Sequence, residues 1–141
     1  ADLYAGLGTI GLRLAAEGRQ VHAAEGDEAM VAALRRAAGL HGLRLTAECR
    51  DLARQPLSGP ELERFDTVLF DPPRAGAASQ AAALAASPVQ RIVAISCNPA
   101  TLARDLRILV DGGYHLDWVR PIDQFPWAAH LEAVACLHRP G

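Results

Sequence analysis

The sequence predicts an α/β fold with a mostly parallel sheet and a C-terminal antiparallel hairpin. Short apolar runs alternate along the chain with amphipathic helical stretches, a pattern typical of parallel α/β layers. A glycine-rich loop joins the first run to the first helical stretch. The last two runs have no helical stretch between them, so we expect them to pair antiparallel. With 141 residues, 50% of them hydrophobic, the chain can form one domain with its own core.

The first half of the chain alternates regularly between strands and helices. After a short first strand, the expected elements are a helix over 10–17, a strand over 20–25, a helix over 28–38 and a strand over 43–49. Asp27 is the expected N-cap of the second helix, and Gly39 is expected to end it. We expect Met30, Val31 and Leu34 of this helix to face the sheet.

The second half continues the alternation and then departs from it. The expected elements are a loop over 55–60, a strand over 65–70, a helix over 79–86, a strand over 91–95, a helix over 101–110, a strand over 114–119, a loop over 121–126 and a strand over 131–137. No repeat or linker divides the chain, so residues 1–141 are expected to form a single domain.

The charge balance gives no sign of a nucleic-acid-binding surface. The chain carries 14 basic and 16 acidic residues, for a net charge of −2. Proteins that bind nucleic acid usually carry a basic excess that neutralises phosphates. We therefore expect that the chain either does not bind RNA or relies on a local patch or on a segment outside this sequence.

The cysteines indicate a reduced protein without a structural metal. Cys49, Cys97 and Cys136 form no CxxC or Cys/His cluster, and free thiols fit a reducing cytoplasm. No signal peptide or bilayer-spanning apolar run is present, so we expect a cytoplasmic monomer without a membrane partner. The sequence opens without Met on the tail of a strand. We interpret it as a fragment of a longer protein, with proteolytic maturation as the alternative.

The first strand is followed by Gly6-x-Gly8-x-x-Gly11, directly before a helix. Glycines at this place allow a tight turn and let a ligand approach the backbone. Glu25, at the tip of the second strand, is placed to accept both ribose hydroxyls of a nucleoside cofactor, or else to cap the following helix. Asp51, after the third strand, is placed to reach the adenine edge. These features fit NAD as well as S-adenosylmethionine.

The fourth strand ends in Asp71-Pro72-Pro73-Arg74. Paired prolines fix the backbone at the point where a sheet presents its carboxyl edge. An acidic, proline-stiffened tip suits a methyltransferase better than a dehydrogenase, because it places the acceptor beside the methyl donor. Arg74 stands where methyltransferases that act on exocyclic amines carry an aromatic residue, which leaves carbon methylation open. We expect Arg74 to bind the substrate. A rigid turn without any function is the alternative.

Ser96-Cys97-Asn98-Pro99 follows the fifth strand and precedes a helix, whose dipole favours a thiolate at Cys97. Thiolate addition at C6 of uracil makes C5 reactive enough to accept a methyl group, and a general base must then remove the C5 proton. Glu132, at the edge of the last apolar run, is the candidate base, with a salt bridge to an arginine as the alternative. Cys49 and Cys136 lack such a context, so we expect them to be buried structural residues.

Four segments together resemble the bacterial RNA (uracil-5-)-methyltransferases, which make 5-methyluridine in tRNA and rRNA. The resemblance covers nearly the whole chain, and its last two segments are the specific ones. The segments are Asp2-Leu3-Tyr4-x-Gly6-x-Gly8, Asp71-Pro72-Pro73-Arg74-x-Gly76, Ser96-Cys97-Asn98-Pro99-x-Thr101-Leu102-x-Arg104-Asp105-Leu106 and Asp123-x-Phe125-Pro126-x-x-x-His130-x-Glu132.

The resemblance implies a Rossmann-like class I S-adenosylmethionine-dependent methyltransferase fold and a role for each matching residue. It implies that Cys97 is the nucleophile and Glu132 the base. It also implies that the cofactor-contacting positions are Tyr4, Thr9, Glu25 and Asp71. The substrate is then tRNA or rRNA, bound with the help of N-terminal segments that this sequence lacks.

Two alternatives to uracil methylation stay open. One is a non-catalytic nucleoside-binding module, which has no need of the Cys97 and Glu132 pair. The other is methylation of another base such as cytosine at C5, which also uses a cysteine. The Asp71-Pro72-Pro73-Arg74 segment favours uracil.

Overall fold

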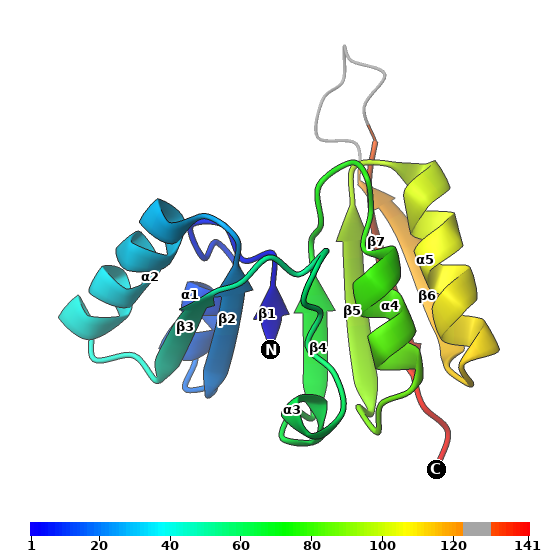
Figure 1. Cartoon of the computed structure of the whole chain (residues 1–141), viewed down its shortest axis with the longest axis horizontal. Coiled ribbons are helices and arrows are strands. Elements are labelled where there is room, and N and C mark those ends of the chain that lie inside the picture. The colour runs from blue at the N-terminus through cyan, green and yellow to red at the C-terminus, as the bar shows by residue number, and fades with distance from the viewer. Residues whose placement is uncertain (123–130) are drawn as a thin grey trace.

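A computed structural model describes residues 1–122 and 131–141 of the chain, and these residues form a 7-stranded sheet with helices on both faces (Figure 1). The strands are β1 (Asp2–Leu3), β2 (Val21–Glu25), β3 (Leu45–Cys49), β4 (Thr67–Phe70), β5 (Arg91–Ser96), β6 (His115–Ile122) and β7 (Glu132–His138). The helices are α1 (Gly11–Ala16), α2 (Glu28–Leu40), α3 (Pro60–Glu63), α4 (Ala78–Ala85) and α5 (Pro99–Asp111). The expected α/β fold class is confirmed.

The strand order is β3-β2-β1-β4-β5-β7-β6. Strands β1 to β5 pair in parallel, whereas β7 pairs antiparallel with both β5 and β6. The order reverses at β1, since the chain runs outward to β3 on one side and to β5 on the other. In such sheets ligands bind beyond the carboxyl ends of the strands near the reversal, because the loops there diverge to opposite faces.

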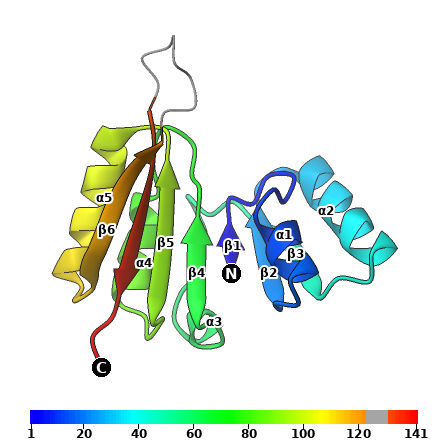
Figure 2. The ribbon, with the colours of Figure 1, turned by 180° about the vertical axis from the view of Figure 1, so that it is seen from behind.

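Helices α4 and α5 cover one face of the sheet over β4 to β7, and α1 lies on the opposite face beside β2 (Figure 2). The core between the sheet and the α4–α5 layer is apolar, and its largest fully buried members include Phe70, Ile92, Leu109 and Tyr114. The Tyr114 hydroxyl donates to the Val89 carbonyl at 2.7 Å, which satisfies the polar end of that buried ring.

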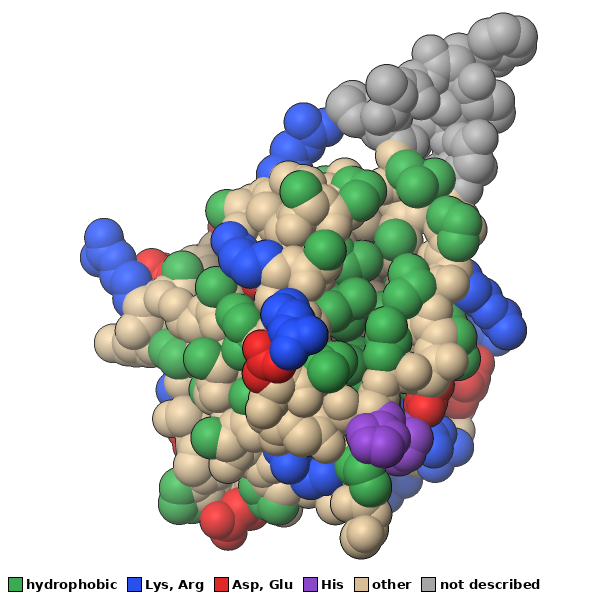
Figure 3. Space-filling model, turned by 90° about the vertical axis from the view of Figure 1, so that its right-hand side faces the viewer, with side chains coloured by type: hydrophobic (Ala, Val, Ile, Leu, Met, Phe, Trp, Pro, Cys, Tyr) green, Lys and Arg blue, Asp and Glu red, His purple; other side chains and the backbone are tan. Residues whose placement is uncertain are grey.

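Strand β6 is the edge of the sheet beside α5, and all of its residues are exposed. Hydrophobic side chains gather on this side of the molecule (Figure 3), and the exposed ones in β6 are Leu116, Trp118, Val119 and Ile122. The sequence predicted a loop from residue 121, but the strand runs through Pro121 to Ile122. An edge strand tolerates proline because one row of its N–H groups needs no partner.

Several boundaries differ from the sequence prediction for local reasons. Helix α5 begins at Pro99 rather than 101, because the Asn98 side chain accepts N–H bonds from Ala100 and Thr101. Helix α2 continues through Gly39 to Leu40. The short helix α3 was not expected at all; its Pro60 stands at the first turn, where the missing N–H costs nothing.

Two burial predictions are wrong. Met30 does not face the sheet: it is exposed, because the buried stripe of α2 runs through Val31, Leu34 and Ala38. Cys49 is exposed rather than buried, since it ends the edge strand β3. Cys136 is half-buried, and burial raises the pKa of its thiol. Within the described residues, no helix is long and apolar enough to cross a membrane.

Candidate functional site

The residues singled out in the sequence gather at the carboxyl edge of the parallel strands. Tyr4 follows β1, Glu25 ends β2, Asp71 follows β4 and Cys97 follows β5. Because neighbouring parallel strands end at the same edge, residues from four separate segments meet there. A larger cavity of about 830 Å³ opens at the opposite edge, lined by Ala1, Asp2 and Thr67 among others, but Tyr4, Glu25, Asp71 and Cys97 are not among the residues that line it.

The loop after β1 turns sharply through residues in left-handed conformations. Tyr4 has φ 59°, Gly6 has φ 55° and Gly8 has φ 85°. Such a φ is rare for a residue other than glycine, so the strain at Tyr4 marks the point where the chain leaves the sheet. Burial, followed by the charges of Asp105 and Asp51, raises the pKa of the Tyr4 hydroxyl to about 12. Tyr4 is therefore neutral at physiological pH.

The glycines of this loop serve different purposes. A Cβ on Gly8 would collide with the Leu34 side chain of α2, so Gly8 allows the loop to pack against that helix. A Cβ on Gly6 would meet nothing within 4 Å, so the backbone at Gly6 faces open space. Thr9, the next predicted contact, is exposed at the same turn. The loop thus has one packed side and one side that a ligand can approach.

A buried carboxylate, Asp2, anchors the base of the loop. Its Oδ2 accepts the Gly11 N–H at 2.9 Å, and a Cβ on Gly11 would lie 2.6 Å from that oxygen. Burial raises the pKa of Asp2 to about 6, against the opposing effect of the Gly11 bond. The sequence motif contained Asp2, but sequence reasoning gave it no role; an acidic residue inside an otherwise apolar strand was the available signal.

Glu25 binds the loop and the helix beyond it. Its Oε2 accepts the Gly6 N–H at 2.8 Å and its Oε1 accepts the Asp27 N–H at 3.0 Å. Asp27, not Glu25, caps α2 by accepting from Ala29 and Met30. Glu25 therefore holds the glycine loop across the end of β2 and retains acceptor capacity for a ligand.

Asp51 lies in the turn after β3. Its carboxylate accepts the N–H groups of Ala53 and Arg54 at 3.0 and 3.3 Å, and one oxygen lies 3.6 Å from the Arg54 guanidinium. Asp51 is exposed, and it influences Tyr4 electrostatically. The structure thus brings it to the rim of the same edge.

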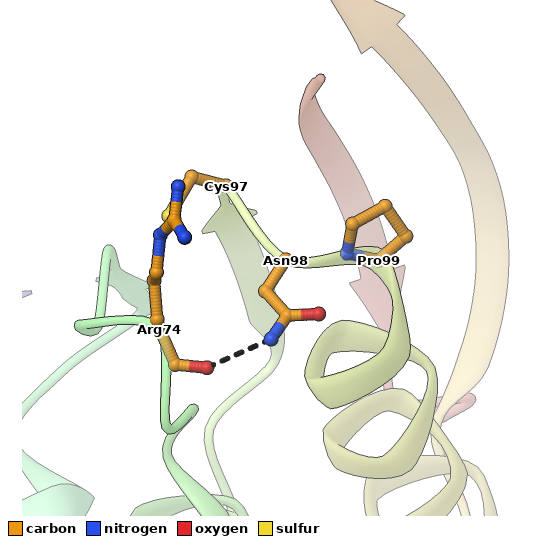
Figure 4. Close-up of a pocket in the computed structure, with 4 residues that line it drawn as sticks. All are labelled: Arg74, Cys97, Asn98 and Pro99. Carbon is orange, nitrogen blue, oxygen red and sulfur yellow. Dashed lines mark hydrogen bonds between the residues drawn. The ribbon is translucent and has the colours of Figure 1, made fainter. Parts of the chain in front are cut away.

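Cys97 and Arg74 line one small pocket at this edge (Figure 4). The pocket has a volume of about 230 Å³ and is lined by Arg74, Cys97, Asn98 and Pro99. The Asn98 side chain donates to the Arg74 carbonyl at 3.0 Å and joins the loop after β4 to the loop after β5. Cys97 is half-buried, directly before the N-cap of α5. The predicted nucleophile thus lies beside the predicted substrate-binding arginine.

Glu132 and Cys97 lie at the same end of the paired strands β5 and β7. The paired register ends with Ser96 across from Ala133, both of them buried. Cys97 follows Ser96 in a bend beyond the end of β5, and the half-buried Glu132 precedes Ala133 as the first residue of β7. Burial, and then the negative charge of Glu132, raises the pKa of Asp71, which follows β4.

One part of the sequence prediction lies beyond the structure, and one structural group was missed. The motif residues Asp123, Phe125, Pro126 and His130 lie outside the described residues. Among the described ones, no group of three or more His, Cys, Asp or Glu residues is arranged to hold a metal ion.

Thr101, Arg104 and Asp105 belong to the third motif segment, but the sequence alone indicated no role for them. In the structure all three contact the loop after β4.

Comparison with known proteins gives consistent matches along the whole chain. A model of the tRNA (uracil-5-)-methyltransferase family matches residues 1–140. An uncharacterised RNA methyltransferase from Mesorhizobium japonicum is 57% identical over 99% of this chain and 34% of its own length. A 23S rRNA (uracil(1939)-C(5))-methyltransferase from Chromohalobacter salexigens is 44% identical over 98% of this chain and 29% of its own.

A solved structure has the same arrangement. The tRNA (uracil-54, C5)-methyltransferase of Pyrococcus abyssi, in complex with S-adenosyl-L-homocysteine, superposes with a TM-score of 0.83. It is 34% identical, and the match covers 96% of this chain and 33% of that one. The chain spans about a third of the length of the curated relatives it matches.

Proposed function

The chain belongs to the tRNA (uracil-5-)-methyltransferase family, and from that premise we propose that it is a catalytic domain that transfers a methyl group from S-adenosylmethionine to C5 of uracil in RNA. One observation supports the proposal: Cys97 and Glu132 each adjoin the Ser96–Ala133 pair, at one end of β5 and β7 and at the edge where the glycine loop also lies. A non-catalytic nucleoside-binding module would have no use for a thiol and a carboxylate at the same end of these strands.

The loop after β1 fits S-adenosylmethionine, because the backbone at Gly6 faces open space while Gly8 packs against α2. We propose that Tyr4, Gly6, Gly8 and Thr9 contact the cofactor from the β1 side. The carboxylates that we propose to complete the site are Glu25, Asp51 and Asp71. Glu25 would accept the ribose hydroxyls while its bonds to Gly6 and Asp27 keep its orientation fixed. When bound there, the cofactor supplies the methyl group.

Cys97 begins the reaction on the base. Its sulfur forms a bond to C6 of uracil, and the electrons of the C5–C6 double bond shift toward C5, which thereby becomes nucleophilic. Once C5 carries the methyl group, the Glu132 carboxylate takes the C5 proton. The electrons of the C5–H bond restore the double bond, and the C6–S bond breaks to release the Cys97 thiolate. The positions of Cys97 and Glu132 at the same end of β5 and β7 suit these two roles.

Arg74 is proposed to contact the RNA substrate, because it lines the pocket that contains Cys97. The net charge of −2 supplies no general attraction for phosphates. We therefore propose that tight RNA binding by a full-length member of the family depends on segments beyond these 141 residues.

The test is methyl transfer from radiolabelled S-adenosylmethionine to an excess of unmodified rRNA and tRNA transcripts, followed by nucleoside analysis. We expect the label in 5-methyluridine, with none after the Cys97→Ala change and unchanged transfer after the matched Cys49→Ala change. Label in 5-methylcytidine would assign the chemistry to another base. Label that persists undiminished after Cys97→Ala would contradict a catalytic role for Cys97.

A further inference from the structure

The first two turns of α5 hold the loop that follows β4, here called the DPPR loop and defined as residues 71–77. The Arg74 carbonyl accepts hydrogen bonds from Asn98 Nδ2 at 3.0 Å and from Thr101 Oγ1 at 3.2 Å. The Ala75 carbonyl accepts from Arg104 Nη2 at 3.0 Å. The side chains of Asn98, Thr101 and Arg104 therefore fix the backbone of the loop at and next to Arg74, the arginine that lines the pocket.

Asp105 is at the centre of these contacts. It is 1% exposed, and its Oδ2 accepts the Ala77 N–H at 2.6 Å. Its Oδ1 accepts from Arg104 Nε and Nη2 at 2.9 and 2.7 Å. Burial of a carboxylate is costly unless hydrogen bonds and an opposite charge compensate it. Here the compensating groups are the loop itself and an arginine that also binds the loop.

Gly76 shows how closely the loop is docked. It has φ 78°, and a Cβ there would lie 2.7 Å from Asp105 Oδ2 and closer still to the Arg104 guanidinium. The loop therefore reaches its position only with glycine next to the Asp105–Arg104 pair. A carboxylate that merely stabilised the helix would not need such proximity. Asp111 on the same helix pairs with Arg107 at the exposed surface.

We infer that Asp105 is a positioning residue: through the Ala77 N–H, and through Arg104 to Ala75, it fixes the DPPR loop so that Arg74 lies beside Cys97. This inference rests on the proposed function only for the role of Arg74, which is to contact the RNA substrate. The placement itself is tested without cofactor or RNA.

The test compares the alkylation of Cys97 by iodoacetate and by iodoacetamide, quantified on the Cys97 peptide by mass spectrometry. Both reagents react with the thiolate, so the thiolate fraction cancels when the iodoacetate rate is divided by the iodoacetamide rate. This ratio reports the local charge that the anionic iodoacetate meets near Cys97. One nearby exposed cation should raise the ratio about threefold, and Arg74→Ala should remove that increase. We expect Asp105→Asn to lower the ratio to the Arg74→Ala value, and Asp111→Asn to leave it unchanged.

A second variant covers the case in which Asp105→Asn fails to fold. Thr101→Val keeps the shape of the side chain but removes its bond to the Arg74 carbonyl, and we expect it to lower the ratio about twofold in a protein with unchanged circular dichroism. An unaltered ratio in the folded Asp105→Asn protein, or in Thr101→Val where Asp105→Asn does not fold, would overturn the inference. An unaltered ratio in Arg74→Ala would also overturn it. Each of these outcomes is independent of whether the chain methylates RNA.

Discussion

The buried carboxylate at the base of the glycine loop should give the protein a distinctive dependence of stability on pH. Burial raises the pKa of Asp2 from 3.8 to about 6 in the folded state. Between these two pH values the folded protein binds more protons than the unfolded one, so stability falls as pH rises. The shift corresponds to about 3 kcal/mol lost between pH 4 and pH 7. We expect Asp2→Asn, which cannot ionise but can still accept the Gly11 N–H, to lack this loss.

The assay is urea unfolding, followed by circular dichroism from pH 4 to pH 8.5, on the chain with and without Asp2→Asn. The quantity of interest is the difference in unfolding free energy between the two proteins, because other titrating groups cancel in it. We predict that the Asn variant gains about 3 kcal/mol relative to the parent across pH 4 to 7. A difference that stays flat across this range would refute the assignment of a raised pKa to Asp2.

Two further predictions concern the glycine loop and the cofactor. Gly8→Ala should lower the free energy of unfolding by about 2–5 kcal/mol, because it combines a left-handed φ with a collision against Leu34. Gly18 has φ 87° but no neighbour within 4 Å, so Gly18→Ala should lower it by only about 1–2 kcal/mol in the same urea titration. Equal losses would show that the Leu34 contact does not matter. Glu25→Gln should weaken the binding of S-adenosylhomocysteine about tenfold, measured by calorimetry, because a neutral amide replaces the carboxylate that also accepts the Gly6 N–H. Glu28→Gln on the neighbouring helix should leave this affinity unchanged. An unaltered affinity in Glu25→Gln would exclude a role of Glu25 in binding the ribose.

Local sequence patterns were sufficient to predict most of the fold. The alternation of apolar runs and amphipathic stretches located six of the seven strands of the described sheet to within a few residues. The absence of a helix between β6 and β7 predicted that these two strands pair antiparallel. The short β1 was anticipated only from the loop that follows it. Errors arose where tertiary context decides: Cys49 is exposed because β3 lies at the sheet edge, and a sequence does not reveal the edge order.

The candidate site, like the fold, could be predicted from the sequence only in part. Cys97, Glu25 and Asp71 could be placed at one edge of the sheet, because each follows a parallel strand. That Cys97 and Glu132 lie at the same end of β5 and β7 depends on the pairing register of these strands, which residue patterns alone do not fix. The role of Asp105 was invisible in the sequence, since a carboxylate in an amphipathic helix ordinarily faces solvent. Only the docked loop reveals why it is buried.

The most direct test of the central claim is covalent trapping with RNA that contains 5-fluorouridine, in the presence of S-adenosylmethionine. Fluorine at C5 leaves no proton for Glu132 to remove, so the bond between the base and the attacking sulfur should persist through denaturation. We predict one adduct, mapped by mass spectrometry to the Cys97 peptide, that is absent in Cys97→Ala and retained in Cys49→Ala and Glu132→Gln. An adduct that persists in Cys97→Ala, or one that maps to another residue of the unaltered chain, would contradict the claim that Cys97 is the nucleophile of this domain.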